Sequence, residues 1–446
     1  MRVKSDELTT VAVIGLGYVG LTLGVALARR GIRVFGVERR PEIVEMTNRG
    51  IPHFSEVGLE AALAQVVKSR LLVASETTEN VPRADYYIIT VGTPLRPGTF
   101  EPRLDMIEEA SRQVAEHFED DATVILRSTV RIGTTRDIVK PVLDRSGKSY
   151  HLAMCPERTL EGDALRELAT LPQIIGGLSA IAADRSAALF SRLTNTTVRV
   201  ADPETAEMIK LVDNTSRDVR FAFANEVARA CDAMGINGQD VIRYGKLGYA
   251  RTNVALPGLV GGPCLAKDPH ILIASVAPRG VELEITAASR KVNERQPAET
   301  IAAICGKLKE RKDGPYTAAV AGLAFKGQPE TDDLRGSMAL RVIEELERTG
   351  VFSELRAFDK VTSREQLEAL PHNLRVCEDF YKACEGADVA IITNNHPFFG
   401  LIDFERVRKC LNPHGFIYDY WNNLGELPPE DLDGHYFTVG NLVGKF

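Results

Sequence analysis

The chain has 446 residues, of which 44% are hydrophobic and 26% are charged, and its formal net charge is −7. One hydrophobic core does not accommodate this length, so we expect two or three domains of ordinary globular composition. The negative charge comes without a block of lysine and arginine, which argues against a nucleic-acid-binding scaffold.

Seven cysteines lie at scattered spacings, and no C-x-x-C pair occurs among them. This odd number supports neither a disulfide framework nor a zinc site, so we expect no metal and a reducing, cytoplasmic location. The apolar run 11–28 is long enough to resemble a membrane span, but four glycines interrupt it. We therefore expect no membrane association.

A dinucleotide-binding pattern opens the chain. A β-branched run over 10–14 predicts a buried strand, and G-L-G-Y-V-G at 15–20 leads into a predicted helix over 21–30. The strand expected over 32–38 ends in Glu38. A strand, this glycine spacing, a helix and a following acid together indicate a Rossmann nucleotide site.

Each part of this pattern has a physical role. Gly15 permits the tight turn, Gly17 lets a pyrophosphate come close, and Gly20 lets the helix pack on the strand. The free N–H groups at the helix start then face the phosphates. Glu38 can accept hydrogen bonds from ribose hydroxyls and repel a 2′-phosphate, which favours NAD over NADP, although Arg39 and Arg40 weaken that preference. The expected NAD contacts are Gly15, Gly17, Tyr18, Val19, Gly20 and Glu38.

Three more strands are predicted over 84–91, 122–128 and 152–157. Ligands bind at the carboxyl ends of parallel strands in a doubly wound sheet, so polar residues that meet there suggest a cleft. The residues expected at this edge are Thr93, Ser128, Thr129 and Glu157.

A long helix is predicted in the middle of the chain. Asp202 and Pro203 are typical of a helix start, and neither proline nor glycine follows before Gly235. Its apolar positions cover a wide arc, so it should pack on several sides or at a dimer interface. Lys210 and Asn214 lie one turn apart on one face, where they can enter a cleft or simply be solvated.

A glycine-rich loop over 256–269 carries Cys264, which follows two glycines and a proline. Lys267 and Asp268 come soon after it. Glycines let the backbone approach a ligand, and a thiol near a cation can act as a nucleophile. A small buried cysteine beside a tight turn is the alternative.

The C-terminal third predicts a second α/β domain without the glycine pattern, where Lys326 and Arg335 are candidate ligands of a phosphate or carboxylate. Its strands are expected over 316–326, 354–359, 387–393 and 415–420, with a helix over 341–348.

These segments together resemble the nucleotide-sugar 6-dehydrogenases, the family of UDP-glucose and UDP-N-acetylmannosamine dehydrogenases. The motifs run in order from 15 to 337: GLGYVG, VGTP, STVRIGTT, CPERTLEG, EMIKLVDNT, FANE, LPGLVGGPCLAKDP and GLAFKGQPETDDLRGS. The resemblance implies an α/β fold of two Rossmann-like doubly wound domains joined by a long central helix. It also implies oxidation of a sugar C6 hydroxymethyl to a carboxylate, with two NAD reduced.

The resemblance also implies roles for single residues. Cys264 matches the nucleophile that forms a thiohemiacetal and then a thioester. Lys210 matches the cation that stabilises the oxyanion, with Asn214 as its partner, and Asp268 matches an aspartate that works with Lys210 on proton transfer. Glu157 and Thr129 match the acid that activates the hydrolytic water and the threonine that holds it. Further cofactor contacts are Thr93, Ser128 and Lys267, and substrate contacts are Arg158, Arg251, Gly261, Lys326 and Arg335.

The sequence combines features of two branches of this family. The Lys267–Asp268 pair is typical of the glucose branch, whereas Arg158–Thr159 resembles the N-acetylhexosamine branch. The sugar therefore stays open between glucose and an N-acetylhexosamine such as ManNAc, and the base between uridine and thymidine. The expected domains are an NAD-binding domain over 1–200, a central dimerisation region over 201–305 and a UDP-sugar-binding domain over 306–446, in a homodimer or higher homo-oligomer.

Two other functions remain. A non-catalytic protein that binds NAD and a nucleotide sugar would not need the set Glu157, Lys210, Cys264 and Asp268. A β-hydroxyacid-type dehydrogenase would share the first domain and a Lys/Asn pair on a long helix, but it would need neither Cys264 nor the α/β segment 316–420.

Overall fold

The computed structural model describes residues 9–425 and 434–440. Contacts within the chain divide it into two compact units. Unit 1 comprises Met1–Asp213 and His270–Glu282, and unit 2 comprises Asn214–Pro269 and Leu283–Phe446.

Unit 1 contains an eight-stranded sheet in the order β3-β2-β1-β4-β5-β6-β7-β8. Neighbouring strands are parallel except β6 and β7, which pair antiparallel. The predicted doubly wound fold is thus present over β1–β6, and the last two strands, β7 and β8, run in the opposite direction. The strands are β1 (Thr10–Ile14), β2 (Arg33–Val37), β3 (Leu72–Ser75), β4 (Tyr86–Ile89), β5 (Ala122–Leu126), β6 (Tyr150–Met154), β7 (Gln173–Gly177) and β8 (Thr197–Val200).

Helices cover both faces of this sheet, because successive side chains of each strand point to opposite faces. In β1, Val11 and Val13 join one buried apolar cluster, whereas Ala12 and Ile14 join the other. The first cluster is closed by α1 (Tyr18–Arg29), α2 (Pro41–Asn48), α3 (Leu59–Lys68), α6 (Ala164–Thr170) and α7 (Ala180–Phe190), and the second by α4 (Asp105–His117) and α5 (Lys140–Asp144).

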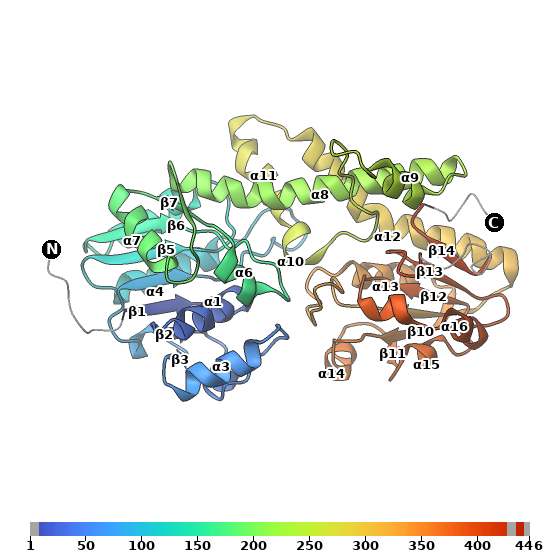
Figure 1. Ribbon diagram of the computed structural model, residues 1–446, viewed down its shortest axis with the longest axis horizontal. Coiled ribbons are helices and arrows are strands. Elements are labelled where there is room, and N and C mark those ends of the chain that lie inside the picture. Colours follow the sequence, from blue (N-terminus) through green and yellow to red (C-terminus); the bar gives the residue numbers. More distant parts are fainter. Residues whose placement is uncertain (1–8, 426–433, 441–446) are drawn as a thin grey trace. The chain divides into compact units, whose positions relative to one another are not determined.

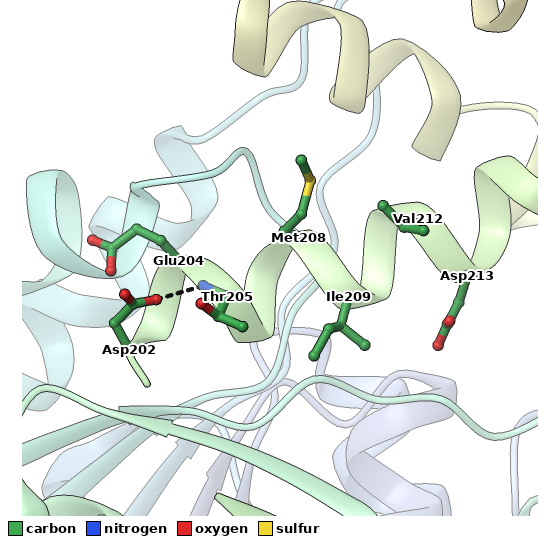
Figure 2. Close-up of a pocket in the computed structure, with 7 residues that line it drawn as sticks. All are labelled: Asp202, Glu204, Thr205, Met208, Ile209, Val212 and Asp213. Atoms are coloured by element: carbon green, nitrogen blue, oxygen red, sulfur yellow. Dashed lines mark hydrogen bonds between the residues drawn. The ribbon is translucent and has the colours of Figure 1, made fainter. Parts of the chain in front are cut away.

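The predicted long helix is α8 (Pro203–Ala233), which has 31 residues and is drawn as one uninterrupted green helix in Figure 1. Asp202 caps it, since its carboxylate accepts the backbone N–H of Thr205 at 2.7 Å (Figure 2). The helices α9 (Gly238–Gly245), α10 (Gly262–Leu265), α11 (Asp268–Val276) and α12 (Glu284–Arg311) follow.

Unit 2 contains a second, six-stranded parallel sheet in the order β11-β10-β9-β12-β13-β14. Its strands are β9 (Tyr316–Ala321), β10 (Phe352–Phe358), β11 (Leu374–Val376), β12 (Val389–Ile392), β13 (Phe416–Asp419) and β14 (Tyr436–Thr438), and its helices include α13 (Met338–Thr349), α14 (Arg364–Glu368), α15 (Phe380–Cys384) and α16 (Phe404–Cys410).

The loop after the first strand has the same internal geometry in both units. Gly15 has φ +94° and Gly322 has φ +83°. Each donates its N–H to the end of the next strand, Gly15 to Val37 at 2.8 Å and Gly322 to Phe358 at 2.9 Å. A threonine hydroxyl then closes each turn: Thr90 donates to Gly15 O at 2.7 Å, and Thr393 donates to Gly322 O at 2.6 Å. The predicted second Rossmann-like domain is therefore confirmed in detail.

Candidate active site

The glycine loop of unit 1 is shaped for a dinucleotide. At Gly20, a Cβ would lie 1.8 Å from Gly15 O, so only glycine lets α1 pack here. At Gly17, a Cβ would meet no atom within 4 Å. The space over the start of α1 is thus open where a pyrophosphate would lie against helix N–H groups. The residues present therefore fit NAD.

Glu38 stands directly after β2, at the position that binds a ribose in this fold. Its carboxylate accepts the backbone N–H of Leu16 at 3.2 Å and the Arg40 Nε–H at 2.9 Å. Burial raises the pKa of Glu38, but the Arg40 pair and the backbone donors outweigh burial and leave the pKa below its usual value. Glu38 is therefore an anion at neutral pH, with the Arg40 guanidinium against it.

Tyr18 connects the glycine loop to the segment after β6. Its hydroxyl donates to Glu56 and accepts the N–H of Gly162 at 3.0 Å. Glu56 also accepts the N–H groups of Gly162 at 2.7 Å and Ala164 at 2.8 Å. Burial, followed by the Glu56 carboxylate, raises the pKa of Tyr18. Sequence reasoning missed Glu56, because nothing near it in the chain indicates this distant contact.

The polar residues predicted at the carboxyl edge of the sheet lie together. The Thr93 hydroxyl donates to Thr129 O at 2.5 Å, and the Ser128 hydroxyl donates to Val91 O at 2.7 Å. Thr129 is half-buried, and the segment after it is fixed by α8. There Glu207 accepts the N–H groups of Gly133 at 2.6 Å and Thr135 at 2.8 Å. Burial raises the pKa of Glu207 to about 7.

Glu157 follows β6 and is bound to a fully buried arginine. Arg127 donates from Nη2 at 2.7 Å and from Nε at 3.0 Å to Glu157 Oε2. The other oxygen, Oε1, accepts the N–H groups of Arg158 at 2.7 Å and Thr159 at 2.9 Å. Burial raises the pKa of Glu157, but the charges of Arg127 and Lys210 and these hydrogen bonds outweigh burial and lower it.

Arg127 was not predicted as a functional residue. The available signal was one charged residue at the end of the apolar run 122–126, which occupies a central strand. A charge in such a place is rare unless it is paired. Its remaining donors are also used, because Nη1 donates to Cys155 O at 3.0 Å and to Gln173 Oε1 at 3.1 Å.

Lys210 lies on α8 and is 7% exposed. Within 9–425 and 434–440, its ammonium group has no hydrogen-bond or ion-pair partner, and its charge acts on Glu157. A lysine with a largely buried side chain and without a fixed partner is suited to stabilise negative charge that develops on a substrate oxygen.

In unit 2, Cys264 is exposed on the short helix α10. The loop before it requires glycine. Gly262 has φ +88° and donates its N–H to Gly336 O at 2.7 Å. A Cβ at this position would lie 2.3 Å from the Phe325 ring. At Gly261, a Cβ would lie 2.5 Å from the same Gly336 oxygen. These contacts fix the backbone that presents the thiol.

Asp268 is fully buried and joins two other predicted residues in unit 2. The Asn214 side chain donates to Asp268 Oδ2 at 2.6 Å, and the Lys267 ammonium pairs with Oδ1 at 2.8 Å. The structure therefore places Lys267, a predicted cofactor contact, against Asp268. Cys264 lies one turn before Asp268 in the chain.

The predicted substrate contacts are divided between the units. In unit 1, Arg158 pairs with Asp213 at 3.2 Å. In unit 2, Arg251 lies 4.8 Å from the centre of the Tyr249 ring, and Lys326 lies 5.4 Å from that of Phe325. Arg335 is exposed and donates to Asp333, at 2.6 Å from Nη2.

Three further observations concern membrane spans, metal ligands and disulfides. No helix within the described ranges has the length and apolar character needed to cross a bilayer. Across the same residues, no group of three or more His, Cys, Asp or Glu side chains could hold a metal ion. All seven cysteines lie in the described ranges, and no two of them form a disulfide.

A doubly wound sheet with this glycine loop and an ionised Glu38 defines the class of nicotinamide-dinucleotide oxidoreductases. Family models agree and are more specific. The NAD-binding domain of the UDP-glucose/GDP-mannose dehydrogenase family matches residues 9–194, its central domain matches 204–295, and its UDP-binding domain matches 319–426. The chain belongs to this family.

Individual proteins support the assignment. The chain is 32% identical to the UDP-N-acetyl-D-mannosamine dehydrogenase of Pyrococcus horikoshii over 94% of this chain and 96% of that protein. A solved structure of UDP-D-ManNAc dehydrogenase from Pyrococcus horikoshii has a TM-score of 0.87 at 31% identity, covering 98% and 100% of the two chains. A UDP-glucose dehydrogenase from Pyrobaculum islandicum has a TM-score of 0.86 at 27% identity, covering 99% of each.

The predicted family, the α/β fold and the NAD cofactor are thereby confirmed. The protein is an NAD-dependent nucleotide-sugar 6-dehydrogenase, which sets aside both the non-catalytic binding protein and the β-hydroxyacid-type dehydrogenase.

Proposed function

We propose that the protein oxidises the C6 hydroxymethyl of UDP-N-acetylmannosamine, or of a related nucleotide hexose, to a carboxylate in two steps through a thioester on Cys264. The first candidate sugar follows the printed names of several relatives, and UDP-glucose is the second because of the Pyrobaculum islandicum enzyme. A dTDP-hexose is a third. The observation that carries the proposal is a buried, ionised Glu157 in the unit that binds the cofactor, with Lys210 acting on it.

In the proposed chemistry, the alcohol first loses a hydride from C6, and its hydroxyl proton passes by way of Lys210 to Asp268, which gives an aldehyde. The Cys264 sulfur then adds to the aldehyde carbon, and Lys210 with Asn214 stabilises the oxygen. Loss of a second hydride from this thiohemiacetal leaves a thioester. NAD, when bound, accepts the hydride in each oxidation.

Hydrolysis completes the reaction. Glu157 takes a proton from a water held at Thr129, the water oxygen attacks the thioester carbonyl, and the carbon–sulfur bond breaks. The sulfur regains a proton, and the sugar leaves as a carboxylate. Asp268 exchanges protons with Lys210 during these steps. This assignment agrees with the lowered pKa of Glu157, because only an ionised carboxylate accepts a proton.

Other assignments follow the same proposal. We infer that Thr93, Ser128 and Lys267 contact the cofactor and that Arg158, Arg251, Gly261, Lys326 and Arg335 contact the nucleotide sugar. The three regions 1–200, 201–305 and 306–446 would bind NAD, join subunits and bind UDP. Seven cysteines without a disulfide fit a reducing cytoplasm.

A homodimer through α8 is also part of the proposal. Met208 and Val212 are 39% and 45% exposed. They line a hollow of about 420 Å³ on the N-terminal part of α8, which belongs to unit 1 (Figure 2). A second copy would cover this surface. Val212→Glu should convert the dimer to a monomer in light scattering, whereas Val198→Glu, at a similarly exposed valine on β8, should not.

The test begins with a measurement of the NADH that the enzyme forms with each of five nucleotide sugars: UDP-ManNAc, UDP-glucose, UDP-GlcNAc, UDP-GalNAc and dTDP-glucose. The true substrate should give two NADH per sugar. With it, Glu157→Gln should accumulate a protein adduct of sugar-nucleotide mass in intact mass spectrometry, and Cys264→Ser should form neither adduct nor acid. Acid formation by Cys264→Ser at the wild-type rate would rule out the covalent mechanism.

A further inference from the structure

We propose that Arg127 is a positioning residue for the hydrolytic step: it holds Glu157 in a single orientation and in its ionised form. The inference rests on the proposed role of Glu157. It goes beyond that role because it assigns a function to a residue whose side chain is fully buried and does not face solvent.

The first support is the geometry of the pair. Both Arg127 donors, Nε and Nη2, converge on one oxygen of Glu157, at 3.0 and 2.7 Å. The other oxygen accepts two backbone N–H groups. Four donors on one carboxylate leave it no freedom to rotate and favour the charged form over the neutral one.

The second support is that Arg127 is itself held. Nη1 donates to Cys155 O at 3.0 Å and to Gln173 Oε1 at 3.1 Å, and the guanidinium lies 4.9 Å from the centre of the Phe190 ring. A guanidinium fixed from β5, β6 and β7 acts as a rigid template.

The charged groups that face Glu157 within unit 1 are Arg127, next to β5, and Lys210, on α8. Arg158, the next residue in the chain, directs its guanidinium to Asp213 instead. Loss of Arg127 therefore removes the larger of these two cationic contributions and leaves that of Lys210, and burial then favours the protonated acid.

The experiment measures how the thioester adduct decays with pH in wild type, Arg127→Gln and Arg127→Lys. The decay rate should fall at acidic pH as Glu157 becomes protonated. Removal of the Arg127 charge should move this acidic limb of the pH profile to higher pH by one unit or more. In Arg127→Gln, adduct should accumulate at the acidic end of the pH series and discharge at the alkaline end. Arg127→Lys keeps the charge but not the paired Nε and Nη2 donors, so it should shift the acidic limb less. KM for the sugar should stay within about twofold.

Arg290→Gln is the matched control, because Arg290 forms another buried pair, with Asp218 at 2.6 Å, within unit 2. It should lower stability without moving the limb. The inference is overturned if Arg127→Gln folds and keeps the wild-type pH profile of adduct decay. If Arg127→Gln does not fold, a wild-type profile in Arg127→Lys overturns it. A Glu157→Gln enzyme that forms no adduct and hydrolyses normally would instead remove the proposed role of Glu157.

Discussion

Replacement of Gly17 by alanine should separate cofactor binding from folding. The residue has φ −66° and ψ −168°, a conformation open to alanine, and the added Cβ would meet no atom within 4 Å. Alanine restricts the unfolded chain, which stabilises by about 0.4–1 kcal/mol, but it is a poorer helix N-cap by a similar amount. We therefore expect the free energy of unfolding to change by less than about 1 kcal/mol.

The same methyl group would fill the open space over the start of α1. A pyrophosphate could then no longer reach the loop backbone, so NAD affinity should fall at least tenfold, which corresponds to about 1.4 kcal/mol. Calorimetric titration with NAD measures this loss, and denaturant unfolding without ligand measures stability. If Gly17→Ala bound NAD as tightly as wild type, the pyrophosphate would not lie over Gly17.

Two neighbouring glycines serve as controls. Gly31→Ala has no atom within 4 Å of its Cβ but forces φ +79° on alanine, so it should lose about 1 kcal/mol of stability and keep its NAD affinity. Gly20→Ala places its Cβ 1.8 Å from Gly15 O and 2.6 Å from Thr90 Oγ1. It should destabilise the fold and weaken binding together.

Three other substitutions test other contacts. Burial raises the pKa of Glu207 from 4.5 to about 7, so the folded protein keeps a proton that the unfolded chain releases, and stability falls by about 3 kcal/mol as pH rises across this window. Glu207→Gln should remove that slope in denaturant unfolding over a pH series, and an unchanged slope would assign it to other groups. Gly262→Ala should cost about 2 kcal/mol and lower activity, because of its φ of +88° and the Phe325 ring. Adding Phe325→Leu should recover part of that stability, and equal losses in single and double variants would contradict the contact. Tyr18→Phe should lose about 1 kcal/mol in thermal unfolding, since Glu56 loses a donor; no loss would mean that the two backbone donors satisfy Glu56.

Much of the fold could be predicted because its signals are local in the chain. Asp202 and Pro203 marked the start of α8 correctly, and the Gly15–Gly20 spacing marked the turn into α1. The reversed direction of β7 and β8 was not predicted, because alternation of apolar residues is the same in parallel and antiparallel strands. Direction depends on long-range pairing that the sequence pattern does not encode.

The candidate site was predicted less completely, for a related reason. Residue types that carry chemistry were visible, such as Glu157, Lys210 and Cys264. Their supporting partners were not, because Arg127 and Glu157 are separated by 30 positions, and Tyr18 and Glu56 by 38. Such contacts form only after distant strands and loops have packed.

The second Rossmann-like domain shows why a motif search finds one nucleotide loop when the fold contains two of similar design. In unit 1 the helix α1 begins at Tyr18, close to Gly15, so helix N–H groups are available to phosphates. In unit 2 the equivalent helix α13 begins at Met338, far along the chain from Gly322.

Asp359 replaces Glu38 at the end of the second strand, but its carboxylate is occupied by this longer loop and the turn that follows. It accepts the N–H of Ala324 at 3.0 Å and those of Val361 and Thr362, both at 2.8 Å. Glu38 also accepts backbone N–H groups, from Leu16 and Arg40, and is paired in addition with the side chain of an exposed Arg40. The shared turn, threonine and acid therefore set the framework of both domains, whereas the length of one loop decides whether a helix begins close to the glycine turn.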